Sequence, residues 1–117
     1  MWQQEAINKI SRAITSDNFV RAIFFKGSLG RGEGDQYSDV DFYCILKEDK
    51  RDEFLKKRID YLQTYKPLIY WSESNFVGPQ IIGVFNNGLH FDLYSIMLNE
   101  LQYTDGIKVI YDPEQLL

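Results

Sequence analysis

Apolar residues recur along the chain with two alternating periods, one typical of helices and the other of strands. Over residues 3–16, isoleucines and alanines recur every three or four positions, which predicts a helix with one buried face. Residues 20–26 are a short apolar run that stops at Gly27, which predicts a central strand running into a turn. The chain is therefore expected to begin with a helix followed by a buried strand.

A second extended run over residues 39–47 places two acidic residues on one face. Successive side chains of a strand point to opposite faces. One face of this strand would carry Val40, Phe42, Cys44 and Leu46, and the other Asp39, Asp41, Tyr43 and Ile45. Asp39 and Asp41 are thus expected to lie side by side.

The second half of the chain reads as one helix followed by short strands. The pattern predicts an amphipathic surface helix over residues 48–65, an edge strand over 67–72, strands over 81–85 and 89–97, and a last strand over 107–111. The dipeptide Asn87-Gly88 between two apolar runs predicts a hairpin. Asp112 followed by Pro113 predicts the capped start of another helix. Alternating helices and strands indicate an α/β chain, or α+β in a stricter scheme, with a mixed, twisted sheet of about five strands and helices mainly on one face.

Composition narrows the classes of function. The chain has 117 residues, 13 Lys and Arg against 17 Asp and Glu, and a formal net charge of −4. An acidic balance argues against long nucleic acid as the main partner. One cysteine and one histidine exclude a disulfide framework and a zinc site of the usual four ligands. With no signal peptide and no apolar run long enough to span a membrane, we expect one cytoplasmic domain over residues 1–117.

The segment between the first two strands is rich in glycine and has the residues of a phosphate-binding turn. Gly27 lets the backbone approach a phosphate closely, and Ser28 offers a hydroxyl and an N–H. Arg31 can pair with phosphate oxygens. Asp39 and Asp41 then suit a hard cation such as Mg²⁺, because the cation relieves the repulsion between two neighbouring carboxylates.

A third carboxylate is available in the predicted hairpin. His90 and Asp92 are two residues apart and share a face of their strand. If that strand neighbours the one that carries Asp41, three acids meet, as a centre with two Mg²⁺ ions requires. His90 is expected to be a rim residue rather than a base.

These motifs together resemble the polymerase-β-type nucleotidyltransferase superfamily. The resemblance rests on Gly27-Ser28 with Arg31-Gly32, on Asp39-Val40-Asp41, and on Asp92 in an apolar strand. Within that superfamily, residues 32–39, Phe42-Tyr43 and the closing Ile110-Tyr111-Asp112 are similar to the catalytic domain of the lincosamide nucleotidyltransferases.

The resemblance implies a reaction and a role for each residue. A nucleoside triphosphate, ATP or another, would give its nucleoside monophosphate to a hydroxyl of a small molecule, with antibiotics of lincosamide or aminoglycoside type as the expected acceptors. Asp39 and Asp41 would bind Mg²⁺, Asp92 would be a ligand or the general base, and Gly27, Ser28 and Arg31 would hold the nucleotide. Lincosamide enzymes usually continue into a helical C-terminal domain, and we expect this chain either to lack that domain or to be separated from it.

Two alternatives stay open at the level of the sequence. The chain could be a minimal, antitoxin-like nucleotidyltransferase that modifies a protein partner, or a nucleotide-binding module without catalysis. An uncovered sheet edge also leads us to expect a homodimer or a helical partner domain.

Overall fold

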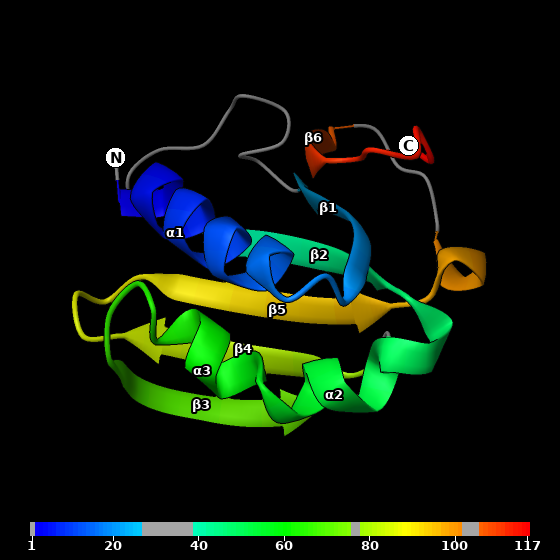
Figure 1. Cartoon of the computed structure of the whole chain (residues 1–117). Helices are drawn as coiled ribbons and strands as arrows, with labels where there is room; N and C mark the ends of the chain where they lie inside the picture. The colour runs from blue at the N-terminus through cyan, green and yellow to red at the C-terminus, as the bar shows by residue number, and fades with distance from the viewer. Residues whose placement is uncertain (1, 27–38, 76–77, 102–105) are drawn as a thin grey trace.

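A six-stranded mixed sheet organises the chain in the computed structural model, which describes residues 2–26, 39–75, 78–101 and 106–117 (Figure 1). Its strands are β1 (Val20–Lys26), β2 (Val40–Leu46), β3 (Leu68–Ser74), β4 (Gln80–Phe85), β5 (His90–Ile96) and β6 (Lys108–Tyr111). They lie in the order β3-β4-β5-β2-β1-β6, and only β2 and β5 pair in parallel. The sheet thus has six strands where about five were expected.

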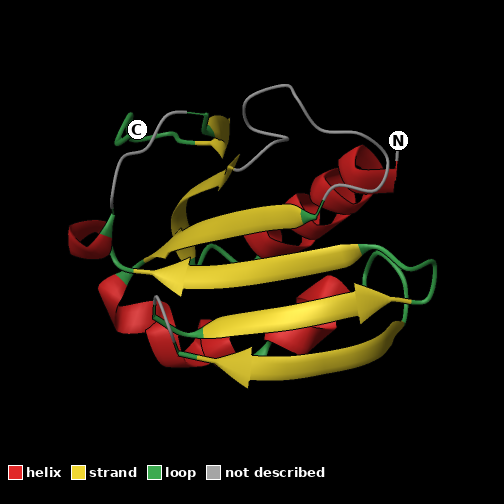
Figure 2. Cartoon of the chain, turned by 180° about the vertical axis from the view of Figure 1, so that it is seen from behind, coloured by secondary structure: helices red, strands yellow, loops and turns green. Residues whose placement is uncertain are grey.

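Among the described residues, three α-helices cover one face of the sheet, which confirms the expected mixed α and β architecture. They are α1 (Trp2–Ser16), α2 (Arg51–Lys56) and α3 (Arg58–Leu62), and two 3-10 turns span Glu48–Lys50 and Leu98–Glu100. Seen from behind, β3, β4 and β5 have no helix in front of them (Figure 2). Within the described ranges, no helix has the length and apolar character needed to cross a membrane.

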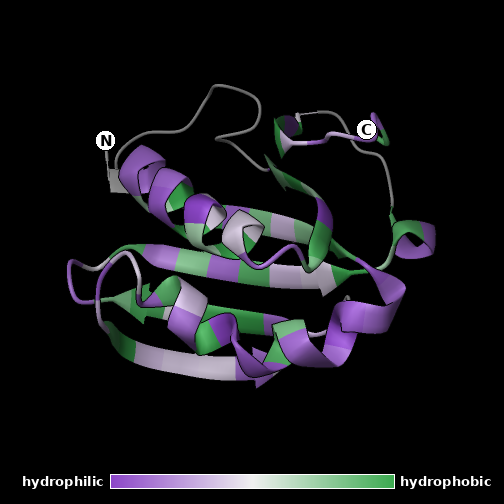
Figure 3. Ribbon diagram, in the orientation of Figure 1, coloured by the Kyte–Doolittle hydropathy of each residue, from purple (hydrophilic) through white to green (hydrophobic). Residues whose placement is uncertain are grey.

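Each face of the sheet has its own apolar core. Hydrophobic residues recur along the central strands (Figure 3). The larger core lies between the helices and the sheet and includes Ile10 of α1, Phe42 of β2 and Phe91 of β5, all fully buried. The smaller core lies on the opposite face, around Phe24 and Ile45. The face that carries Asp41 is therefore the one with the smaller core, because Asp41 alternates with Phe42 along β2.

The helix expected over residues 48–65 is not continuous. It divides into a 3-10 turn, α2 and α3, with the break at Lys57. The N–H of Lys57 donates to the carbonyl of Phe54 three residues back, and its ammonium lies 2.5 Å from Asp17, just after α1. The hydroxyl of Tyr61 also donates to Asp17 at 2.7 Å. The break thus lies at the residue whose side chain contacts Asp17, and periodicity within the segment carries no signal of that contact.

The hairpin between β4 and β5 is confirmed, with Gly88 at its tightest point. Gly88 has a φ of 88°, and its N–H donates to the carbonyl of Phe85 at 2.8 Å. The side chain of Asn87 accepts the N–H of Leu89 at 3.2 Å. Glycine adopts this left-handed backbone without the steric cost that a Cβ would bring.

The helix predicted after Asp112 is wrong for residues 112–117. This segment forms a turn, and Gln115 has a positive φ of 56°, which no right-handed helix contains. The carboxylate of Asp112 accepts the N–H groups of Leu116 and Leu117, both at 2.8 Å. Asp112 therefore satisfies backbone donors, as a cap does, without starting a helix.

Candidate active site

The parallel pairing of β2 with β5 brings Asp41 and Asp92 together. Their Cα atoms are direct partners in the register, although 51 positions separate them in the sequence. Partners on adjacent strands project to the same side of the sheet and interact directly. The sequence predicted that Asp92 would join the acids only if its strand neighboured that of Asp41. The structure shows that the two strands are neighbours.

The other predicted site residues divide into two groups. Asp39 lies exposed one residue before β2, and its charge acts on both Asp41 and Asp92. Gly27, Ser28 and Arg31, the predicted nucleotide-binding residues, lie outside the described residues. His90 is exposed at the start of β5, as expected for a rim position.

Burial and nearby negative charges raise the pKa values of the two facing carboxyl groups. Burial, followed by the charges of Asp41 and Asp39, raises the pKa of Asp92 to about 6. Burial and the charge of Asp39 also raise the pKa of Asp41. The charge of Lys26 and a hydrogen bond with Asp92 act in the opposite direction and lower it. Two half-buried acids of this kind are stabilised by a bound cation or by a shared proton.

The arrangement fits a divalent cation that is only partly coordinated by protein. Among the described residues, no three acidic, histidine or cysteine side chains are gathered closely enough to form a metal site by themselves. Mg²⁺ usually takes one or two carboxylates and completes its octahedron with water and substrate phosphates. Asp41 and Asp92, two facing half-buried acids whose pKa values are both raised, provide such a pair.

An aromatic stack lies on the same face of the sheet as the carboxylates, next to them along β2 and β5. The ring of Tyr43 stacks on Tyr94 with centroids 4.3 Å apart and on Phe24 with centroids 4.9 Å apart. Hydrogen bonds link Tyr94 to Tyr43 and to Gln80 of β4, and burial raises the pKa of both tyrosines. Sequence reasoning missed this stack, although its signal is present: each tyrosine follows a site aspartate by two residues.

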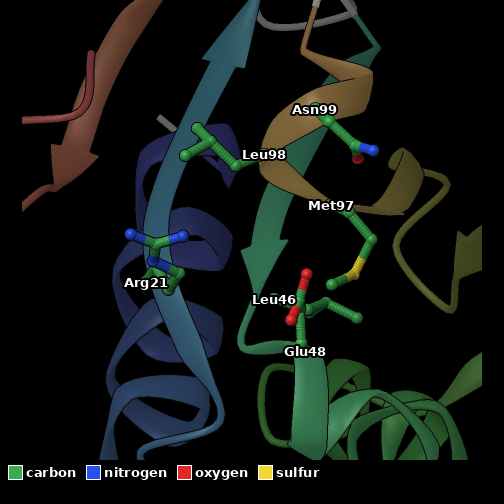
Figure 4. Close-up of a pocket in the computed structure, with 6 residues that line it drawn as sticks. All are labelled: Arg21, Leu46, Glu48, Met97, Leu98 and Asn99. Atoms are coloured by element: carbon green, nitrogen blue, oxygen red, sulfur yellow. The ribbon is translucent and has the colours of Figure 1, made fainter.

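A separate pocket of about 330 Å³ lies at the far end of β2 (Figure 4). It is lined by Arg21, Leu46, Glu48, Met97, Leu98 and Asn99. Leu46 is five residues from Asp41, about 16 Å along a strand. This pocket therefore contains none of the site carboxylates, which lie on an open face of the sheet.

Comparison with known proteins assigns the chain to a family of domains. A model of the nucleotidyltransferase domain matches residues 7–108, most of the chain. The chain therefore belongs to the nucleotidyltransferase domain family, a family of transferase enzymes. No match is found among curated proteins.

Solved structures agree at the level of the fold. Terminal uridylyl transferase 4 from Trypanosoma brucei with bound GTP matches with a TM-score of 0.53 and 14% identity, over 88% of this chain and 30% of that one. The same enzyme with bound CTP matches with a TM-score of 0.55 and 16% identity, over 85% of this chain and 31% of that one. The chain thus spans less than a third of the length of these neighbours.

The raised pKa of Asp92 predicts a characteristic dependence of stability on pH. Native Asp92 holds its proton more tightly than the unfolded chain does, so stability falls as the pH rises from about 4 through about 6. In EDTA, Asp92→Asn and the wild type should have similar unfolding free energies near pH 4. As the pH rises toward 7, the variant should become more stable than the wild type. Urea denaturation at several pH values measures this, and a difference independent of pH would contradict it.

Proposed function

We propose that this chain transfers a nucleoside monophosphate from a nucleoside triphosphate to a hydroxyl group of a small molecule and releases pyrophosphate. The observation that carries the proposal is the register that places Asp41 opposite Asp92 on an open face of the sheet. Membership of the nucleotidyltransferase domain family supports the same type of reaction. The bound GTP and CTP of the structural neighbours are consistent with a triphosphate as donor.

Each site residue has a role in the proposed reaction. Asp39 and Asp41 would hold Mg²⁺, and Asp92 would be a further ligand if two ions bind. Bound Mg²⁺ would supply charge neutralisation for the triphosphate. Asp92 accepts the proton of the attacking hydroxyl, for which a pKa of about 6 is well suited. The acceptor oxygen forms its bond to the α-phosphorus as the bond to pyrophosphate breaks. Gly27, Ser28 and Arg31 hold the phosphates.

The acceptor approaches over the uncovered side of β4 and β3. Ile82 is the Cα partner of Asp92 in β4, and Ser72 is the partner of Ile82 in β3. Both side chains are partly exposed, so an acceptor with an apolar ring and hydroxyl groups has a surface beside Asp92. We propose a small molecule of the lincosamide or aminoglycoside class, since the acidic chain disfavours a long nucleic acid.

A protein acceptor or a second copy of the chain is the other candidate partner. Three consecutive residues of the edge strand β3 are strongly exposed: Ile69, Tyr70 and Trp71. Large exposed side chains on an unpaired edge are typical of contact surfaces. This observation supports the antitoxin-like alternative and the expected homodimer.

Intact-mass analysis of acceptors tests the proposal. The chain is incubated with Mg²⁺, each of the four ribonucleoside triphosphates, and lincomycin or kanamycin. We expect the mass of the acceptor to increase by one nucleoside monophosphate, and we expect no increase with Asp41→Asn. Asp52→Asn should give the same increase as the wild type, because the side chain of Asp52 is 82% exposed and lies outside the site. Labelling of the chain itself or of an added protein would favour a protein acceptor. Nucleotide binding with no pyrophosphate release in any reaction would indicate a module without catalysis.

A further inference from the structure

Lys26 places a positive charge next to the paired carboxylates. It is the last residue of β1, and its Cα is the direct partner of Asp41 in β2. Partners across strands share a face, so Lys26 projects to the same side as Asp41 and Asp92. Its charge reaches Asp41 and lowers the pKa of that carboxyl group, against the effect of burial.

The aromatic stack holds the ammonium group of Lys26 in place. Its Nζ lies 4.7 Å from the centroid of the Tyr43 ring, within the range of a cation–π contact. Tyr43 is itself fixed between Phe24 and Tyr94. Among the described residues, Lys26 forms no ion pair, so no described carboxylate takes up its charge by direct contact.

The three charged groups lie in a row across three neighbouring strands. Asp92 is on β5, Asp41 is on β2 and Lys26 is on β1, in register, with about 4.8 Å between strands. In an in-line displacement, the attacking oxygen and the leaving group lie on opposite sides of the reacting phosphorus. If the acceptor hydroxyl lies by Asp92, the leaving pyrophosphate lies on the side of β1.

We propose that Lys26 binds the β- and γ-phosphates of the nucleotide and stabilises the departing pyrophosphate. This inference rests on the proposed function, because it assumes that the attacked phosphorus lies above Asp41. An ammonium group suits this task as a compact point charge for phosphate oxygens. Lys26 thereby offsets the repulsion that a triphosphate meets beside a set of acids.

Lys108 offers a matched control on the other face of the same sheet. Its Cα partner on β1 is Phe25, which packs in the core beneath the helices. Paired residues share a face, so Lys108, which is exposed, projects to the face opposite Asp41. Replacing either lysine with methionine removes one positive charge, but only Lys26→Met removes it from the site.

Binding of separate parts of the nucleotide tests the proposal. Isothermal titration in Mg²⁺ compares pyrophosphate, a nucleoside triphosphate and the matching monophosphate. For Lys26→Met we expect pyrophosphate and triphosphate to bind about 10- to 100-fold more weakly, and the monophosphate to bind as in the wild type. Lys26→Arg should recover part of the loss, and Lys108→Met should bind all three ligands normally.

Three outcomes would count against the proposal in distinguishable ways. Unchanged pyrophosphate binding by Lys26→Met overturns the role of Lys26 and leaves the proposed function intact. Equal weakening of pyrophosphate and monophosphate shows a general structural effect on the site, which also overturns it. No binding of any triphosphate by the wild type overturns the proposed function itself.

Discussion

Replacing Asp92 with Asn is expected to lower the rate of nucleotidyl transfer about 1,000-fold and to make the metal-free protein more stable. The amide cannot take the proton of the attacking hydroxyl, and it is a poorer ligand for a hard cation. It also removes the charge that faces Asp41 across the β2–β5 pair. Because Asp92 is partly exposed, solvent screening limits the gain in unfolding free energy to about 1 kcal/mol.

Magnesium should reverse the order of stability. A ligand that binds only the native state adds RT ln(1 + [L]/Kd), about 1.4 kcal/mol at ten times Kd. We expect Mg²⁺ to stabilise the wild type and to have little effect on Asp92→Asn. Urea denaturation at pH 7.5 with EDTA or with Mg²⁺, alongside a transfer assay, measures both effects. Asp52→Asn is the control for loss of a carboxylate, and a variant destabilised in EDTA would contradict the electrostatic account.

Replacing Phe91 with Ala is expected to lower the free energy of unfolding by about 3–4 kcal/mol. Phe91 is fully buried on the helix-covered face of β5, next in sequence to Asp92. Its ring centroid lies 5.3 Å from that of Phe42 on β2 and 5.9 Å from that of Phe85 on β4. Truncation therefore leaves a cavity among the side chains of three paired strands.

Chemical denaturation of Phe91→Ala measures this loss, and Ile69→Ala is its matched control. Ile69 is 67% exposed on β3, so its truncation should change stability by no more than about 0.5 kcal/mol. The Phe91 variant should also transfer nucleotide more slowly wherever it remains folded, because the same packing holds β5 beside β2. An equal, small effect of both substitutions would show that the core does not depend on this ring.

Part of the site was predictable from local patterns alone. Alternation along residues 39–47 correctly set Asp41 on the face opposite Phe42, and the Asn87-Gly88 signal correctly located the hairpin before Asp92. These signals are local because strand alternation and turn geometry depend on a few adjacent residues. The prediction of one helix over residues 48–65 was wrong: the segment breaks at Lys57, whose side chain contacts Asp17, 40 positions away, and no local pattern contains that contact.

The sequence by itself determined the types of the elements and the chemistry of the acids, because periodicity, turn residues and side-chain identity are encoded locally. Only the tertiary structure decided that β5 pairs with β2 in parallel and in the register that sets Asp41 against Asp92. It also decided that Tyr43 and Tyr94 stack and that Lys26 lies above Tyr43. Such contacts join residues distant in sequence, and their free energy comes from packing the whole sheet, which no short window contains.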